Sequence, residues 1–260
     1  MASSETSAAP VMGPVARPGL RPGVRPVVRP VVRPGPGGPA ASPGAPDAPA
    51  APDRPAGPDP LAALAAELRA LPPSCGPVRL VAVDGHAGSG KTTFAARLAA
   101  ALGGAPVVHL DDLATHAEPF GWTERLRGQV LEPLAAGRDA EYEVYDWTLR
   151  RFAGTAAVPL APVVLVEGVG AGRRAVRPEL ARLVWMELDA AAARRRGEQR
   201  DGPGLAEFWA GWALAESAHF AADPSRPHAG TLVDGVTGRI APGTVGEPST
   251  TPLTCDVARK

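Results

Sequence analysis

One stretch of the chain, residues 78–93 (VRLVAVDGHAGSGKTT), restricts its fold more than any other. An apolar run from Val78 to Val83 is followed by the pattern Gly85-x-x-x-x-Gly90-Lys91-Thr92, and an Ala/Leu-rich segment from Phe94 to Leu102 comes next. The order strand, glycine-rich loop, helix is the context that a phosphate-binding P-loop requires. The sequence therefore predicts an α/β fold in which a strand delivers an anion-binding loop to the start of a helix.

The residue types in this loop explain how it would hold phosphate. Glycines at 85, 88 and 90 let the backbone curl so that several N–H groups point at one anion. Lys91 would bring a mobile positive charge to the β- and γ-phosphates, and the Thr92 hydroxyl would ligate Mg²⁺. The residues predicted to bind the phosphates are Gly85, His86, Ala87, Gly88, Ser89, Gly90, Lys91, Thr92 and Thr93.

Composition excludes several other classes of protein. The 27 basic and 27 acidic side chains give a formal net charge of zero, so the chain has no general attraction to nucleic acid or to a membrane surface. We find no long apolar span and no secretory signal at the start, which predicts a cytoplasmic protein. The expected substrate, a small molecule, follows from the P-loop. Cys75 and Cys255 show no metal-ligand spacing and give no support for a disulfide. The oligomeric state stays open.

The chain divides into three zones. Residues 1–58 are rich in Pro, Gly, Ala and Arg, with Arg-Pro pairs every four residues from Arg17 to Pro34, and are expected to form a disordered tail. A weak tether to an anionic or proline-binding partner is the alternative for this tail. Residues 59–238 have the size and composition of one globular domain. Residues 239–260 are expected to be a flexible C-terminal tail.

Strands and helices alternate along the globular zone. The strands are predicted at 78–83, 106–110, 163–166, 182–188 and 230–233, and the helices at 60–71, 94–102, 124–136, 190–200 and 205–222. Continuous apolar strands separated by helices are typical of a parallel sheet that is covered on both faces. We therefore expect a three-layer P-loop fold with a five-stranded parallel sheet.

Carboxylates follow the predicted strands at the edge where an open α/β sheet binds its ligand. Asp111 and Asp112 come directly after residues 106–110, and Glu167 follows residues 163–166. Such acids could ligate Mg²⁺ or orient an attacking hydroxyl, so Asp111 is predicted to be catalytic and to contact substrate. Glu167 is predicted to contact metal or substrate. The simpler roles are a helix cap at Asp111 or Asp112 and support of the P-loop by Glu167.

Three further groups of side chains could contribute. Arginines crowd the helix predicted at 190–200, where a P-loop kinase places its lid, and Arg196 and Arg200 are the predicted catalytic pair. Tyr142 and Asp146 lie in the segment EYEVYDW, predicted to be a loop, where they could contact a substrate or Tyr142 could fill the core. The aromatic stripe of helix 205–222 has the spacing of core packing.

With these residues in view, the chain resembles the uridine kinase-like branch of the P-loop kinases. The matching segments are VAVDGHAGSGKTT, VVHLDDL, EVYDW, VVLVEGV and RRRGEQR, spread over residues 78–200. The resemblance implies transfer of a phosphoryl group from ATP–Mg²⁺ to a nucleoside 5′-hydroxyl. It maps the acid that activates or orients the hydroxyl onto Asp111, the substrate-contacting acid onto Asp146, and the EG glutamate onto Glu167. The family's His-Pro after that second acid is replaced here by Trp147-Thr148.

Two alternatives remain at this point. The glycine-rich loop is also similar to that of the cytidylate kinases, so a nucleoside monophosphate is a second candidate acceptor. A P-loop ATPase or nucleotide-dependent switch without a small-molecule acceptor is the other. The sequence after the strand at 182–188 lacks a guanine-reading Asn/Thr-Lys-x-Asp pattern, which disfavours a GTP-dependent switch.

Overall fold

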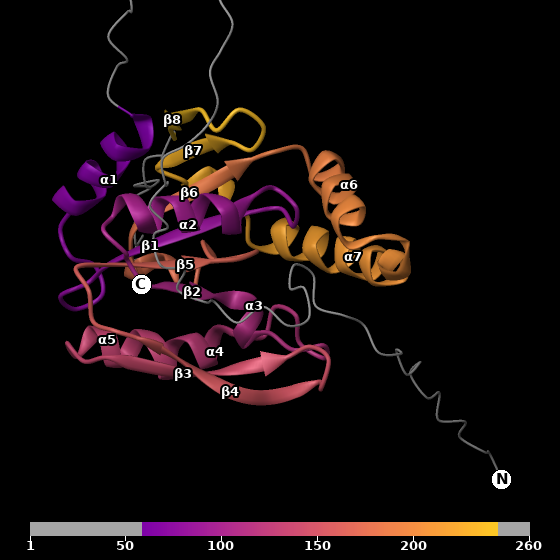
Figure 1. The fold of residues 1–260 in the computed structure, drawn as a ribbon, viewed down its shortest axis with the longest axis horizontal. Helices are drawn as coiled ribbons and strands as arrows, with labels where there is room; N and C mark the ends of the chain where they lie inside the picture. The colour runs from indigo at the N-terminus through magenta and orange to yellow at the C-terminus, as the bar shows by residue number, and fades with distance from the viewer. Residues whose placement is uncertain (1–58, 244–260) are drawn as a thin grey trace, which may run out of the picture.

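The computed structural model describes residues 59–243, which form a mostly parallel sheet with helices on both faces (Figure 1). Within these residues the main sheet has six strands in the order β2-β5-β1-β6-β7-β8. The strands are β1 (Arg79–Gly85), β2 (Val107–His109), β5 (Val163–Glu167), β6 (Leu180–Glu187), β7 (Thr231–Asp234) and β8 (Ile240–Pro242). The tail predicted at 1–58 and residues 244–260 lie outside the described residues.

Five of these strands are parallel and correspond to the five that the sequence predicts. The sixth, β8, pairs antiparallel with β7 and falls at the start of the segment expected to be a flexible tail. A tight turn returns the chain, because Asp234 accepts hydrogen bonds from the backbone N–H groups of Val236 and Thr237, both at 2.8 Å. A strand of three residues is too short to produce a hydrophobic period, which explains why the sequence did not reveal it.

Alternation along β1 shows how the core forms on both sides of the sheet. Leu80 and Ala82 pack into one buried cluster, and Val81 and Val83 pack into the other. The second cluster is closed by α1 (Pro60–Ala70) and α2 (Lys91–Ala101). The first is closed by α4 (Thr123–Leu126), a π-helical turn at Arg127–Leu131 and α5 (Glu132–Ala135), which together occupy the predicted helix 124–136. Residues at alternate positions therefore serve opposite layers.

A β-hairpin that the sequence analysis did not predict lies beyond α4 and α5 (Figure 1). It pairs β3 (Ala140–Asp146) with β4 (Arg151–Val158), so Tyr142 and Asp146 belong to a strand and not to the predicted loop. The β3 side chains alternate, with Ala140 and Tyr142 buried and Glu141 and Glu143 exposed. This alternation is a strand signal, but the exposed glutamates gave the segment the composition of a loop.

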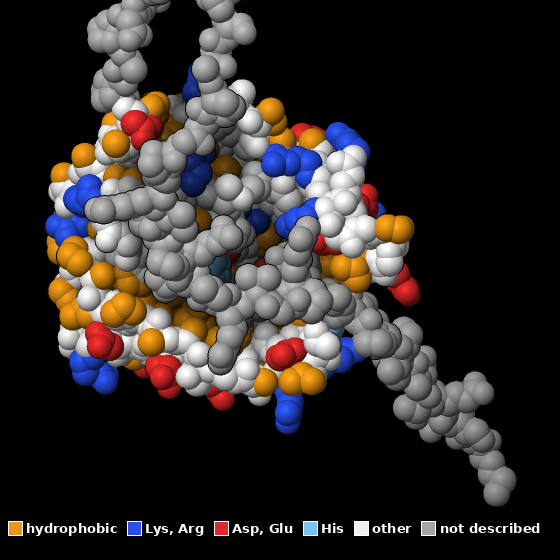
Figure 2. Space-filling view, in the orientation of Figure 1, with side chains coloured by type: hydrophobic (Ala, Val, Ile, Leu, Met, Phe, Trp, Pro, Cys, Tyr) orange, Lys and Arg blue, Asp and Glu red, His pale blue; other side chains and the backbone are white. Residues whose placement is uncertain are grey.

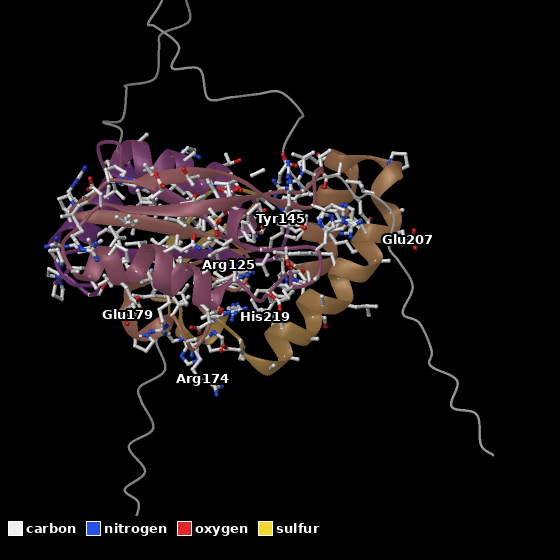
Figure 3. The ribbon with its side chains drawn as sticks, turned by 90° about the horizontal axis from the view of Figure 1, so that it is seen from below. Arg125, Tyr145, Arg174, Glu179, Glu207 and His219 are labelled. Carbon is white, nitrogen blue, oxygen red and sulfur yellow. The ribbon has the colours of Figure 1, made fainter. Side chains whose placement is uncertain are left out.

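Two helices extend from the carboxyl ends of the strands. They are α6 (Ala190–Asp201) and α7 (Ala206–Ala222), and α7 runs from an outer end at Glu207 back to the sheet at His219 (Figure 3). No helix within residues 59–243 has the length and apolar character needed to cross a bilayer.

The contact between α6 and α7 depends on a glycine, which gives a first testable prediction. A Cβ at Gly197 would lie 2.2 Å from the ring of Trp209, a side chain that is 1% exposed. Replacing a helical glycine with alanine usually stabilises by about 0.5–1 kcal/mol. Here we expect Gly197→Ala to lower the free energy of unfolding by about 1–3 kcal/mol, because the Trp209 ring must move.

Gly211 on α7 is the matched control. It is exposed and a Cβ there would meet nothing within 4 Å, so Gly211→Ala should stabilise the protein. Urea unfolding of the two variants beside the native chain measures both effects. Equal shifts of the two unfolding curves would contradict the packing described for Gly197.

Candidate functional site

The P-loop curls at glycines that hold conformations other residues rarely adopt. Gly88 and Gly90 have φ angles of 88° and 98°. A Cβ at Gly88 would lie 2.1 Å from the carbonyl oxygen of Ala193 on α6, so this position accepts only glycine. Gly90 is the residue before α2 and has no side chain that could cap the helix. The first N–H groups of α2 thus face the loop, as an anion site requires.

Lys91 is held inside the loop. Its Nζ donates to the carbonyl oxygens of Gly85 and His86, both at 2.9 Å, and the residue is 8% exposed. Lys91 is therefore not a freely exposed lysine on a loop. The ammonium group is therefore already placed within the ring of backbone that would surround a phosphate.

Asp84, which the sequence analysis did not single out, fixes the base of the loop. It is fully buried at the end of β1, and its carboxylate accepts from the backbone N–H groups of Gly85, Gly170 and Gly172 at 2.7–2.9 Å. Three such hydrogen bonds stabilise a buried carboxylate. An aspartate at the end of an otherwise apolar strand was the available signal for this role.

Glu167 lies close to side chains from one helix, α2, and from one neighbouring strand, β2. Its Oε1 lies 3.2 Å from the Thr92 hydroxyl on α2 and 2.6 Å from Nδ1 of His109 at the end of β2. Burial alone would lower the pKa of His109, but the hydrogen bond and charge of Glu167, with Asp112 and Asp111 nearby, outweigh burial and raise it. The sequence analysis predicted Thr92 and Glu167 here and missed His109.

These oxygen donors fit Mg²⁺ in part. The Thr92 hydroxyl and the Glu167 carboxylate are hard oxygen ligands that lie beside the P-loop. Among residues 59–243 no group of three His, Cys, Asp or Glu side chains is arranged to hold a metal by itself. Mg²⁺ commonly keeps few protein ligands and takes the rest from phosphate and water, so a metal here would depend on a bound nucleotide.

The two aspartates after β2 differ in their surroundings. Both lie on the short helix α3 (Leu110–Leu113). Asp112 is 7% exposed and accepts a hydrogen bond of 3.2 Å from the hydroxyl of Tyr142. Asp111 is less buried, and its backbone oxygen accepts from Trp147 Nε1 at 3.0 Å. Both side chains reach the cavity described next.

A cavity of about 1190 Å³ lies between the P-loop and the helices α6 and α7. Of the predicted residues, ten line it: Ala87, Gly88, Gly90, Lys91, Thr92, Thr93, Asp111, Glu167, Arg196 and Arg200. The other five do not line it: Gly85, His86, Ser89, Tyr142 and Asp146. Tyr142 is buried against Asp112, and Asp146 closes the hairpin turn by accepting from the N–H groups of Thr148 and Leu149, both at 2.8 Å.

The arginines of α6 separate into two groups. Basic side chains gather over this helix in Figure 2, but only Arg196 and Arg200 line the cavity. Arg194 instead pairs with Glu198 at 2.6 Å. Arg200 donates to both oxygens of Asp201 at 2.7 and 3.0 Å, which raises the pKa of Arg200 and keeps it charged.

Aromatic side chains of α7 form a wall of the same cavity. Phe208, Trp209 and Trp212 line it, and the Phe208 and Trp212 rings stack at an interplanar angle of 27° with centroids 5.9 Å apart. The sequence analysis read this stripe as core packing. Phe220 packs edge-on against Trp185, and Phe208 and Trp209 are buried, as that reading expects, but the three residues nearer the start of α7 also border the cavity. Trp147, from the turn after β3, borders it as well.

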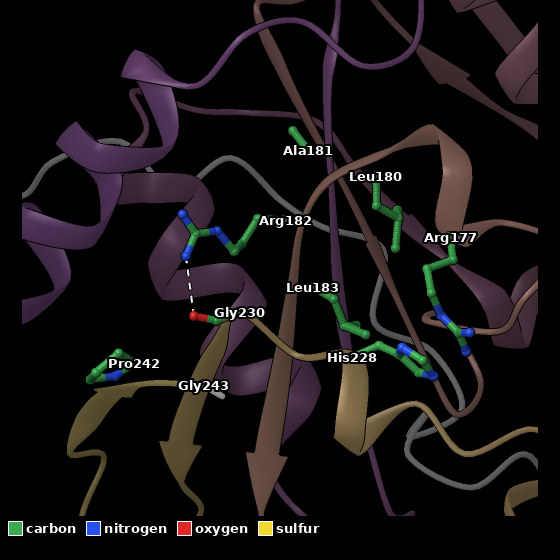
Figure 4. Close-up of a pocket in the computed structure, with 9 residues that line it drawn as sticks. All are labelled: Arg177, Leu180, Ala181, Arg182, Leu183, His228, Gly230, Pro242 and Gly243. Carbon is green, nitrogen blue, oxygen red and sulfur yellow. Dashed lines mark hydrogen bonds between the residues drawn. The ribbon is translucent and has the colours of Figure 1, made fainter. Parts of the chain in front are cut away.

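A second, smaller cavity of about 500 Å³ lies at the amino end of β6 (Figure 4). Its cationic side chains already have partners. Arg182 donates to the carbonyl oxygen of Gly230 at 3.1 Å, and Arg177 pairs with Asp223 at 3.0 Å. Ligands of open α/β sheets bind at the opposite, carboxyl end of the strands, so the first cavity is the candidate active site.

Comparison with solved structures identifies the fold. The chain is similar to a possible uridine kinase from Bacillus stearothermophilus, with 21% sequence identity and a TM-score of 0.50, covering 67% of this chain and 97% of that one. It also matches a candidate fructose transport system kinase from Silicibacter sp., with 25% identity and a TM-score of 0.40, covering 62% and 86%. No protein-family model and no curated protein sequence matches the chain. The likeness to the first of these structures confirms the predicted three-layer α/β fold of a P-loop protein.

Proposed function

We propose that this protein transfers a phosphoryl group from ATP–Mg²⁺ to a hydroxyl of a small molecule, and that this acceptor is a nucleoside. One observation carries the proposal. The P-loop with Lys91, the Thr92–Glu167 pair, Asp111 and two lid arginines all open on a single cavity. Phosphoryl transfer needs positioning and charge stabilisation more than covalent chemistry from the protein, and these residue types supply both.

Each group has a distinct role in this proposal. Lys91 and the loop N–H groups would bind the β- and γ-phosphates, with Thr92 and Glu167 holding Mg²⁺, which neutralises phosphate charge. Asp111 would orient the acceptor hydroxyl and accept its proton. Arg196 and Arg200 would stabilise charge on the transferring group. Tyr142 would act through Asp112, and Asp146 through the turn that carries Trp147.

The proposal of a nucleoside acceptor depends on the aromatic side chains that border the cavity. Flat rings stack on aromatic side chains, and Phe208, Trp212 and Trp147 border the cavity that Asp111 also reaches. An acceptor whose ring lies against this wall could place a hydroxyl at Asp111. A nucleoside combines such a ring with such a hydroxyl.

A transfer assay tests the proposal. Purified protein is incubated with γ-labelled ATP, Mg²⁺ and a panel of nucleosides, nucleoside monophosphates and sugars, and the label is followed by chromatography. We expect label on a nucleoside. Label on a monophosphate would indicate a cytidylate-type kinase, and free labelled phosphate with no labelled acceptor would indicate an ATPase. Absence of any Mg²⁺-dependent affinity for a purine nucleotide in calorimetry would overturn the proposal as a whole.

The two lid arginines give a second testable prediction. We expect Arg196→Ala and Arg200→Ala each to lower kcat by about 10²–10³-fold, since each removes a charged donor from the cavity. Arg194→Ala is the matched control, because Arg194 stands on the same helix but pairs with Glu198 outside the cavity. Steady-state rates of the three variants decide the matter, and similar losses in all three would argue against a catalytic lid.

A further inference from the structure

A buried glutamate that is distant from the P-loop in the sequence contacts the loop directly. Glu216 on α7 is 8% exposed, and its Oε1 accepts a hydrogen bond from the backbone N–H of Ala87 at 2.7 Å. Its Oε2 lies 3.3 Å from Nδ1 of His86. The carboxylate thus contacts two consecutive residues of the loop, and the functional roles assigned above do not include it.

This contact concerns the group on which a P-loop depends. Backbone N–H groups of the loop bind phosphate, so their directions decide whether the loop is competent. Glu216 accepts the Ala87 N–H and so directs that group toward α7, which fixes the path of the backbone that carries the neighbouring N–H groups. Neither Glu216 nor His86 lines the cavity, whereas Ala87 and Gly88 do. The carboxylate therefore holds the loop from outside the space that phosphates would occupy, and it does not compete with them for that space.

Further contacts hold the P-loop in place on both of its sides. The His86 ring packs edge-on between Phe220 of α7 and Trp185 of β6, with ring centroids 5.1 and 5.7 Å apart. On its other side, the loop touches α6, where Gly88 approaches the carbonyl of Ala193. The outer turn of the loop, residues 86–88, is thus clamped between α6 and α7. The helix that carries Glu216 also carries the aromatic wall of the cavity.

We infer that Glu216 is a positioning residue for nucleotide binding. It holds the outer turn of the P-loop against α7 in the shape that binds the phosphates of ATP. This inference rests on the function proposed above. A hydrogen bond to a charged group in a buried setting contributes substantially more than a neutral one, so its loss should be measurable in nucleotide affinity.

Three variants test the inference by calorimetry with Mg²⁺ and ATP. Glu216→Ala removes the acceptor, and we expect the Kd for ATP to rise about 10- to 100-fold. Glu216→Gln keeps a carbonyl oxygen for the Ala87 N–H but loses the charge, and we expect its Kd to lie between those of the native protein and the alanine variant. Glu216→Asp keeps the charge but is one methylene shorter, so it should resemble the alanine variant. Glu207→Ala, an exposed glutamate on the same helix, is the matched control (Figure 3).

A general loss of stability would give a different pattern. Each Kd is measured at a temperature where circular dichroism shows the variant folded, and Glu216→Asp provides the test if the alanine variant does not fold. Native affinity in folded Glu216→Ala or Glu216→Asp would overturn the inference while leaving the proposed function intact. A native protein that binds no nucleotide would overturn the proposed function instead. Weak binding by Glu216→Gln equal to that of Glu216→Ala would also count against the hydrogen bond to Ala87.

Discussion

We expect Lys91→Ala to remove nearly all of the proposed phosphoryl transfer and to leave the domain folded. The Lys91 ammonium is held by two loop carbonyls within the ring of backbone that would surround the phosphates. No other lysine lies among residues 59–243, and the arginine side chains that line the cavity, Arg196 and Arg200, come from α6. Since electrostatic stabilisation supplies most of the rate in phosphoryl transfer, we expect kcat/KM to fall by at least about 10³-fold.

The fold should tolerate the Lys91→Ala change. Alanine is a strong helix former, and Lys91 is the first residue of α2. The two freed carbonyls border the loop, where water can reach them once the side chain is absent. Arg97→Ala is the matched control, because it removes a basic side chain from an exposed position on the same helix. Transfer rates and thermal melting are measured for both. Near-native transfer by Lys91→Ala would place the site elsewhere.

The elements that sequence reasoning recovered share one physical property. Strands β1 and β5 are buried on both faces, so they read as continuous apolar runs that no loop would carry. Open α/β sheets bind their ligands at the carboxyl ends of the strands, and every parallel strand ends at the same edge of the sheet. This was enough to predict Asp111 and Glu167 as site residues. Local pattern and topology together were enough to bring these residues to one cavity.

The elements that were missed depend on contacts distant in the sequence. Strand β4 is mostly exposed and rich in small residues, and it is held by pairing with β3 and not by its own pattern. Glu216 meets the P-loop from 129 residues away. The aromatic residues of α7 lie along one side of the helix, so sequence spacing could not show which of them also border the cavity. Such features follow from tertiary packing, which a local pattern does not encode.

The two adjacent aspartates provide the other prediction with a large effect. Asp111→Asn should lower kcat by about 10²–10⁴-fold, the range for loss of a general base, while the Kd for ATP–Mg²⁺ stays near the native value. The amide is close in size to the carboxylate but cannot accept the hydroxyl proton. Single-turnover transfer measures the chemical step, and calorimetry measures nucleotide affinity.

Asp112→Asn is the matched control, one residue away on the same helix turn. Asp112 is the more buried of the two, and its carboxylate accepts from the Tyr142 hydroxyl, a bond that an asparagine oxygen can keep. We therefore expect a loss of at most about tenfold in this variant. If Asp112→Asn lost the chemical step and Asp111→Asn did not, the base would be Asp112, and Tyr142 would then act directly on the base. Equal, small losses would mean that neither carboxylate takes the proton and that positioning by Lys91 and the lid arginines supplies the rate.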